Sequence, residues 1–265
     1  PRPAPITLAA AAVAGADGVL VAGGAHAIAA LAFGVGPIPA SDVVVGPGNL
    51  YVTAAKQLLA GQVQIDMLAG PSELLVIADA GADPAWVASD LLAQAEHDPH
   101  AVPILISLDA EFPSLVEREI ERRLEDLPTA STARAALANG GVIVCETEDA
   151  ACLASDDIAP EHLQLSVSNP EAWPDRLHHY GALFIGERAA EVFGDYGVGP
   201  NHVLPTGGTA RARGGLSVMD FLRVRTWIRA DSAPDLDLIE DVAWFARQEG
   251  LEAHARAAEI RREKT

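Results

Sequence analysis

Hydrophobic residues follow two alternating patterns along this chain. Short, continuous apolar runs rich in β-branched residues predict buried strands. These runs are residues 18–21, 43–45, 74–77, 102–106, 142–145, 163–166 and 182–185. Other segments space their apolar residues as amphipathic helices do. These segments are residues 6–14, 25–33, 50–59, 84–97, 111–127, 218–228 and 236–262.

Strands that alternate with helices in this way are typical of parallel sheets covered on both faces. The alternation restarts after residue 71, and the Gly and Pro content rises between residues 194 and 215. We therefore predict an α/β fold of two incomplete Rossmann-like units, residues 1–71 and 72–215, followed by a small helical tail, residues 216–265. The first unit is called incomplete because a doubly wound half usually offers more strands.

The composition of the chain argues against nucleic-acid-binding, membrane-spanning and disulfide-rich classes of protein. The formal net charge of −19 argues against a nucleic-acid partner, because the phosphate backbone would be repelled. The alanine-rich run at residues 6–36 contains Asp17 and His26, so we expect no membrane span. Two cysteines, Cys145 and Cys152, make a poor disulfide framework, which fits a reducing cytoplasm. No signal peptide is visible, and the absence of an initial Met indicates processing or a piece of a longer chain.

The helix predicted at residues 84–97 carries two side chains that suit a metal ion. Asp83 can cap it, and Pro84 fits its first position, where the missing N–H costs nothing. Gln94 and His97 lie three residues apart and are therefore neighbours on one face of its C-terminal end. Their oxygen and nitrogen atoms could hold a divalent metal from two sides. The alternative is a polar helix end in water.

Two small-residue loops are candidate ligand contacts. Residues 46–49 (GPGN) join a strand to a helix, where small residues and the helix N-terminus favour an anion such as a pyrophosphate. This is not the Gly-x-Gly-x-x-Gly fingerprint, so a plain tight turn explains the loop equally well. Ser72, in the loop at residues 69–73 (AGPSE), offers a hydroxyl to a ligand. It lacks the Gly-x-Ser-x-Gly setting of a nucleophile.

Glu161 and His162 stand side by side between Pro160 and a predicted strand. A carboxylate and an imidazole are the usual pair for activating a water molecule and moving a proton. In the loop before the strand both side chains can turn into one cleft, although within a strand they would point to opposite faces. The alternative is a solvated glutamate beside a histidine at the edge of the core.

Two further residues extend the candidate metal site. Asp195, in the glycine-rich loop at residues 194–202, supplies a hard oxygen. His254 follows Gly250, where one helix could end, and falls in the first turn of the next. With Gln94 and His97 they would form a nitrogen- and oxygen-ligated site for zinc or manganese. Sequence spacing does not show that they converge.

Six short motifs occur in an order that resembles one known family. They are residues 23–34 (GGAHAIAALAFG), 46–49 (GPGN), 69–73 (AGPSE), 94–97 (QAEH), 160–163 (PEHL) and 201–206 (NHVLPT). The chain resembles histidinol dehydrogenase over essentially its whole length. The resemblance implies a zinc- and NAD-dependent four-electron oxidation of L-histidinol, through L-histidinaldehyde, to L-histidine, in the last steps of histidine biosynthesis.

The resemblance also implies roles for the candidate residues. His162 would take the hydroxyl proton, and Glu161 would help water to attack the aldehyde. Asn49 would contact NAD, as would the position of His26, where the family usually has glutamine. The implied zinc ligands are Gln94, His97, Asp195 and His254. The implied substrate contacts are Ser72, His162, Glu249 and the four zinc ligands.

The family is a homodimer whose C-terminal helices cross to the partner. The resemblance therefore implies that Glu249 and His254 complete the neighbouring subunit's site. Family chains carry a long additional stretch before this point, which implies that this chain is N-terminally truncated. Two alternatives remain: a relative that oxidises another small polar alcohol to its acid, and a non-catalytic zinc-binding fragment.

Overall fold

The computed structural model describes residues 2–199, 201–231 and 234–262. The chain divides into two compact units, Pro1–Leu222 and Arg223–Thr265. The domain ranges predicted from the sequence, 1–71, 72–215 and 216–265, stay predictions. The predicted fold class, α/β with parallel sheets, is confirmed.

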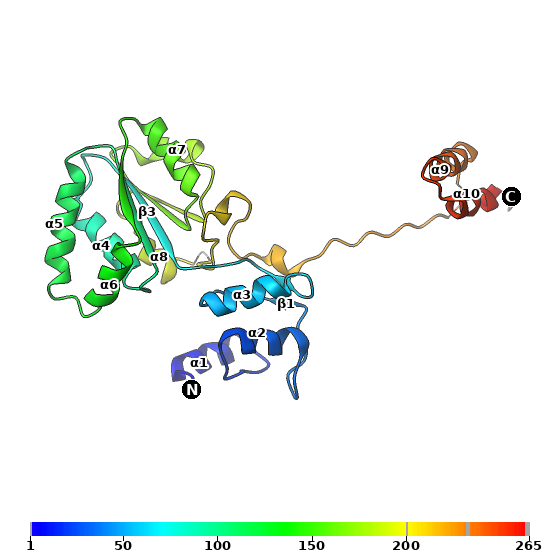
Figure 1. Cartoon of the computed structure of the whole chain (residues 1–265), viewed down its shortest axis with the longest axis horizontal. Helices are drawn as coiled ribbons and strands as arrows, with labels where there is room; N and C mark the ends of the chain where they lie inside the picture. Colours follow the sequence, from blue (N-terminus) through cyan, green and yellow to red (C-terminus); the bar gives the residue numbers. More distant parts are fainter. Residues whose placement is uncertain (1, 200, 232–233, 263–265) are drawn as a thin grey trace. The chain divides into compact units, whose positions relative to one another are not determined.

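A five-stranded parallel sheet forms the centre of the first unit, in the order β5-β4-β3-β6-β7 (Figure 1). Its strands are β3 (Glu73–Ala78), β4 (Val102–Ser107), β5 (Gly141–Val144), β6 (His162–Ser166) and β7 (Ala182–Ile185). The chain enters in the middle at β3, builds outward through β4 and β5, and then adds β6 and β7 on the other side of β3. All four pairings are parallel, as the continuous apolar runs predicted.

Helices cover both faces of this sheet (Figure 1). The helices are α4 (Pro84–Ala95), α5 (Phe112–Leu124), α6 (Ala130–Leu137) and α7 (Glu148–Ile158). Successive residues of a strand point to opposite faces, so Leu74 and Val76 of β3 pack with α4 and α5. Leu75 and Ile77 pack on the other face with α7. From Leu74 to Ala78, both faces of β3 are thus fully buried.

The N-terminal part of the first unit holds a smaller parallel pair of strands. Its elements are α1 (Pro5–Val13), α2 (Gly24–Phe33), β1 (Val43–Val44), α3 (Leu50–Leu59) and β2 (Gln64–Ile65). Ala32, Val44, Leu59 and Val63 form its core. The strand predicted at residues 18–21 is wrong. Its Val and Leu side chains are 37–50% exposed and the segment pairs with no strand, so nothing holds it extended.

Short helical turns complete the first unit. They are η1 (Pro170–Ala172), η2 (Pro174–Arg176), α8 (Glu191–Asp195), η3 (Thr209–Arg211) and η4 (Val218–Phe221). The helix predicted at residues 218–228 is wrong beyond Phe221. Trp227 and Ile228 are 81% and 98% exposed, so there is no packing surface to stabilise a longer helix.

The second unit is a helical hairpin of α9 (Leu236–Gln248) and α10 (Glu252–Glu259), followed by η5 (Ile260–Arg262). The helix predicted at residues 236–262 is interrupted at Gly250, whose φ is +75°. The N–H of Gly250 donates to the Arg247 carbonyl at 3.0 Å, and that of Leu251 donates to the Ala246 carbonyl at 2.8 Å. These are the two bonds of a Schellman motif. Alanines 243, 246 and 255 pack where the helices meet.

Among the residues that the structure describes, no helix has the length and hydropathy needed to cross a membrane.

Candidate active site

Most of the predicted site residues lie at the amino-terminal edge of the five-stranded sheet. Ser72 directly precedes β3, and Glu161 directly precedes β6, which begins at His162. Helix α4 runs back along the sheet between the parallel strands β3 and β4, so its last turn, with Gln94, returns to the same edge. Ligands of doubly wound sheets usually bind at the opposite, carboxyl edge. The strand order alone would therefore have indicated the wrong edge.

Glu161 is tied to Glu73 across strands β3 and β6. The N–H of Glu73 donates to Oε2 of Glu161 at 2.9 Å, and the N–H of Glu161 donates to Oε2 of Glu73 at 3.3 Å. Burial raises the pKa of Glu161 to about 8, and the hydrogen bond from Glu73 lowers it only in part. The Glu161 carboxyl is therefore mainly protonated at neutral pH.

His162 is held as a neutral base. Its Nδ1 lies 2.9 Å from the backbone carbonyl oxygen of Glu73. A carbonyl only accepts, so Nδ1 carries the proton and Nε2 keeps its lone pair. Burial lowers the pKa of His162, which keeps the ring neutral. Nδ1 also lies 3.6 Å from Oε2 of Glu161, so the predicted pair does converge.

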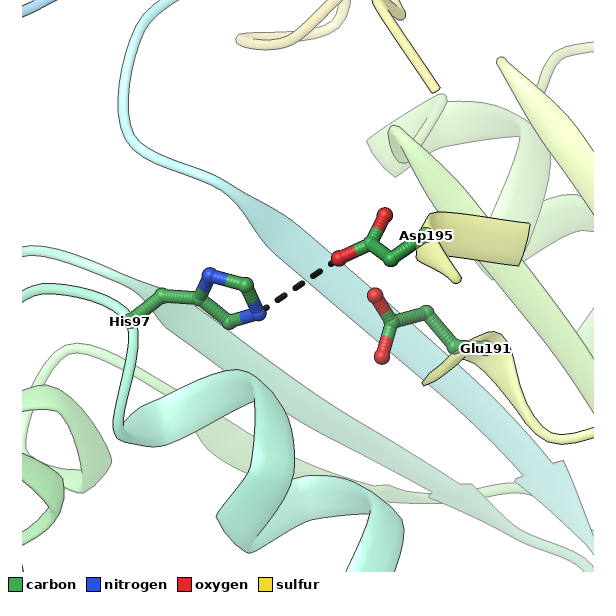
Figure 2. A group of neighbouring side chains, drawn as sticks. All are labelled: His97, Glu191 and Asp195. Carbon is green, nitrogen blue, oxygen red and sulfur yellow. Dashed lines mark ion pairs between the residues drawn. The ribbon is translucent and has the colours of Figure 1, made fainter. Parts of the chain in front are cut away.

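Three side chains gather near the end of α4 as a candidate metal centre. Figure 2 shows His97, from the turn after α4, facing Glu191 and Asp195 of α8. Nε2 of His97 lies 3.6 Å from Oδ2 of Asp195. One ligand atom from each of the three side chains lies within 4.8 Å of the others. The structure thus brings together His97 and Asp195, as predicted, and adds Glu191.

Two buried side chains carry polar atoms that test whether this edge of the sheet suits a metal ion. Gln94 is fully buried, and within the described residues neither its amide oxygen nor its amide nitrogen has a hydrogen-bond partner. Oε1 of the buried Glu191 is also without one. Each such atom costs about 1–3 kcal/mol when it is left unpaired. The imidazole nitrogen of His97 and the side-chain oxygens of Gln94, Glu191 and Asp195 are the kinds of ligand atom that zinc or manganese takes, so the residues present suit a divalent cation.

Glu191 was missed in the sequence, although it stands four residues before Asp195 on one helix. That spacing was the available signal. The N–H of Glu191 donates to Oε1 of Gln164 at 3.2 Å, and Nε2 of Gln164 donates to Asp90 at 2.6 Å. Burial and the nearby Asp195 raise the pKa of Glu191 to about 7. A buried polar network therefore lies behind the candidate metal centre.

Asn49, Ser72 and His97 line one cavity of about 490 Å³, a size in the range of small-molecule pockets. Oδ1 of Asn49 accepts hydrogen bonds from the N–H groups of Tyr51 and Val52 at 3.1 and 3.2 Å, and so caps α3. The structure does not bring His26 to this cavity; it lies exposed in the first turn of α2.

Two predicted site residues belong to the second unit. Glu249 follows α9, and His254 lies in the first turn of α10, as predicted; both are exposed. Their convergence with Gln94, His97 and Asp195 stays a prediction.

The fold and site define a parallel α/β protein with a neutral imidazole, a buried carboxyl and donors for a divalent cation at one sheet edge. Residues 1–262 match the family model described as histidinol dehydrogenase. The chain belongs to the histidinol dehydrogenase family.

Individual relatives agree with this assignment. The chain is 48% identical to histidinol dehydrogenase of Thermus thermophilus over 99% of its own length and 64% of the relative. It is 48% identical to that of Ralstonia nicotianae over 98% of its own length and 59% of the relative. The crystal structure of histidinol dehydrogenase from Elizabethkingia anophelis superimposes with a TM-score of 0.86 at 39% identity, covering 95% of this chain and 58% of that one. The chain thus spans about three fifths of the length of these relatives.

Proposed function

We propose that this chain oxidises L-histidinol through L-histidinaldehyde to L-histidine, using zinc and NAD, in the last steps of histidine biosynthesis. The observation that carries the proposal is the presence, at one sheet edge, of a base and of side chains that suit a divalent cation. His162 presents a neutral Nε2, and Gln94 buries two unpartnered polar atoms. Nε2 of His162 can remove an alcohol proton, and the amide oxygen of Gln94 can bind a cation.

The residues that would hold the metal are Gln94, His97, Asp195 and His254. When bound, zinc would anchor and polarise the nitrogen groups of the substrate, and NAD would accept hydride from its alcohol carbon. Ser72 and Glu249 would contact the substrate beside these ligands. Asn49 and His26 would lie on the NAD side, although Oδ1 of Asn49 is already engaged in capping α3.

His162 would act first. Its Nε2 takes the hydroxyl proton of the alcohol while the Glu73 carbonyl keeps the ring oriented through Nδ1. Glu161 would act second, when its carboxylate form accepts a proton from the water that attacks the aldehyde. Oε2 of Glu161 lies 3.6 Å from Nδ1 of His162, so the two side chains are neighbours, and in the proposed reaction they would serve one reacting carbon in succession.

We also propose that the protein is a cytoplasmic homodimer in which the second unit of each chain completes the partner's site with Glu249 and His254. Family membership supports this. So does the exposed apolar surface of α9, where Leu238 and Val242 are 55% and 44% exposed. His254 lines a groove together with these two residues. A surface of this kind is suited to contact with another chain.

NADH formation from L-histidinol and NAD, with zinc restored after purification, tests the proposal. We expect turnover by the wild-type chain, and a loss of about 10²–10⁴-fold in H162A with its zinc content unchanged. H178A removes an exposed histidine of the same unit and should behave as wild type. Absence of NADH from zinc-loaded wild-type protein would refute the activity. Loss of zinc in H162A would refute the division of roles.

A further inference from the structure

One buried ion pair holds both backbone polar groups of a single loop residue. Nζ of Lys56, on α3, pairs with Oδ1 of Asp66 and donates to the Gly46 carbonyl at 2.8 Å. The N–H of Gly46 donates to the other carboxylate oxygen of Asp66 at 2.7 Å. Lys56 and Asp66 are 2% and 1% exposed. The N–H and C=O of Gly46 therefore each bind one member of the pair.

Gly46 has a backbone conformation that needs such support. Its φ is +108°, in a region that residues with a side chain rarely adopt. Two residues on, a Cβ at Gly48 would lie 2.6 Å from side-chain atoms of Val52, so the loop sits directly on α3. The ion pair and helix α3 thus together fix the conformation of the loop at residues 46–49.

The same network reaches the second wall of the cavity. Oδ1 of Asp66 also accepts the N–H of Met67 at 2.7 Å, and the Thr53 hydroxyl donates to the Ala69 carbonyl at 2.6 Å. These bonds connect α3 to the segment that leads into Gly70, Pro71 and Ser72. The ion pair, which does not itself line the cavity, thus holds the loop before residues 47–51, and helix α3 holds the segment before residues 70–72 through Thr53.

We propose that Lys56 and Asp66 are a positioning pair that fixes the Gly46–Asn49 loop in the shape that receives the dinucleotide. The inference rests on the proposed NAD-dependent function. Burying two charges is a poor way to gain stability, because an apolar pair of similar size often serves as well. A buried ion pair can, however, fix one backbone conformation, since Asp66 binds the N–H of Gly46 and Lys56 binds its C=O.

The double variant K56M/D66N tests the pair without leaving one buried charge unpaired. We expect its KM for NAD to rise about tenfold or more, because the loop loses its fixed shape, while kcat at saturating NAD and zinc content stay within about twofold of wild type. R134M/E121Q is the control. It removes an exposed ion pair of the same unit, with side chains 51% and 60% exposed, and should leave all three quantities unchanged. An unchanged KM for NAD, or a rise in KM accompanied by a fall in kcat and zinc content, would overturn the inference.

Hydrogen exchange separates this inference from the proposed function. In K56M/D66N we expect faster exchange at the amides of Gly46 and Met67, which donate to Asp66 in the wild type, with unchanged protection in β3 and β6. Equal protection in both proteins would overturn the positioning role even if NADH is formed. If the wild-type protein binds no NAD, the proposed function is refuted. Faster exchange in K56M/D66N would then still show that the pair fixes the loop, but the loop's role in receiving the dinucleotide would be refuted together with the function.

Discussion

Glu161 shows how burial sets the chemistry of one residue. Burial is the largest cause that raises the pKa of its carboxyl. The negative charges of Glu73 and Asp195 raise this pKa further, so both burial and charge oppose ionisation. At neutral pH it is mainly a neutral group beside a neutral His162. In the proposed reaction it would become a base only as the pH approaches 8.

The pH dependence of stability should report this burial. The folded-state pKa of Glu161, about 8, lies above its unfolded value, so its contribution to stability is fully present below about pH 4.5 and is lost as the pH rises through 8. In metal-free protein we expect the free energy of unfolding to fall between pH 6 and 9 more steeply in wild type than in E161Q. Urea unfolding at a series of pH values measures this. Equal slopes would show that Glu161 ionises normally.

Adjacency in the sequence was enough to predict that Glu161 and His162 lie together, because both stand at the start of β6. It could not reveal Glu73, which binds them through backbone groups across two strands that are distant in the chain. The identity of a base can be read from a motif. Its tautomer depends on a carbonyl that only the fold supplies.

At the scale of elements, α4 and α8 carry the candidate metal centre. The i, i+3 spacing of Gln94 and His97 predicted two donors on one helix face, but α4 ends at Ala95, and His97 lies in the turn beyond it. The i, i+4 spacing of Glu191 and Asp195 was equally informative once α8 was known. Such a short helix, only Glu191–Asp195, has no hydrophobic periodicity by which to find it.

Gln94→Leu should separate stability from metal binding. It replaces a buried side chain with two unpartnered polar atoms by an apolar one of similar size. We expect the free energy of unfolding of the metal-free protein to rise by about 1–3 kcal/mol, while zinc affinity falls at least tenfold. Chelator competition measures the affinity, and urea unfolding the stability.

The control for this experiment is Gln62→Leu, at an exposed position of the same unit. It should change neither quantity. A Gln94→Leu protein that keeps its zinc affinity would show that Gln94 is not a ligand, and the metal centre would have to be rebuilt around the remaining donors.

Continuous apolar runs predicted the strands of the sheet, and the run at residues 74–77 is apolar because both faces of β3 are buried there. This rule failed at residues 18–21, where an apolar run pairs with no strand. The rule of helical spacing failed at residues 218–228, where apolar side chains remain exposed. A local pattern of apolar residues predicts a helix or strand correctly only where the rest of the fold supplies a surface for it to pack against. In both segments the described structure supplies none.

At the scale of the whole molecule, the proposed site needs residues from two units. Gln94, His97 and Asp195 belong to Pro1–Leu222, and His254 belongs to Arg223–Thr265. Sequence reasoning could place His254 at the start of α10, because Gly250 marks the break between helices. It could not say which chain's metal centre His254 serves, since no local pattern encodes an arrangement between subunits.

Mixing two inactive variants tests the exchange between subunits. If His254 serves the partner, a heterodimer of H162A and H254A contains one site with both wild-type residues. Random reassociation of equal amounts should then restore about a quarter of wild-type activity. Activity of the mixture after unfolding and refolding together measures this, and the separately refolded proteins are the control. No recovery would mean that each chain uses its own His254.

The most direct test of the central claim is the number of NADH molecules formed per L-histidinol when the substrate is limiting and NAD is in excess. A site that uses His162 for the alcohol and Glu161 for the aldehyde should carry the substrate through both oxidations. We expect two NADH per L-histidinol, with L-histidine as the product. One NADH with an accumulating aldehyde would contradict the role of Glu161, and none, with zinc bound, would contradict the proposed activity as a whole.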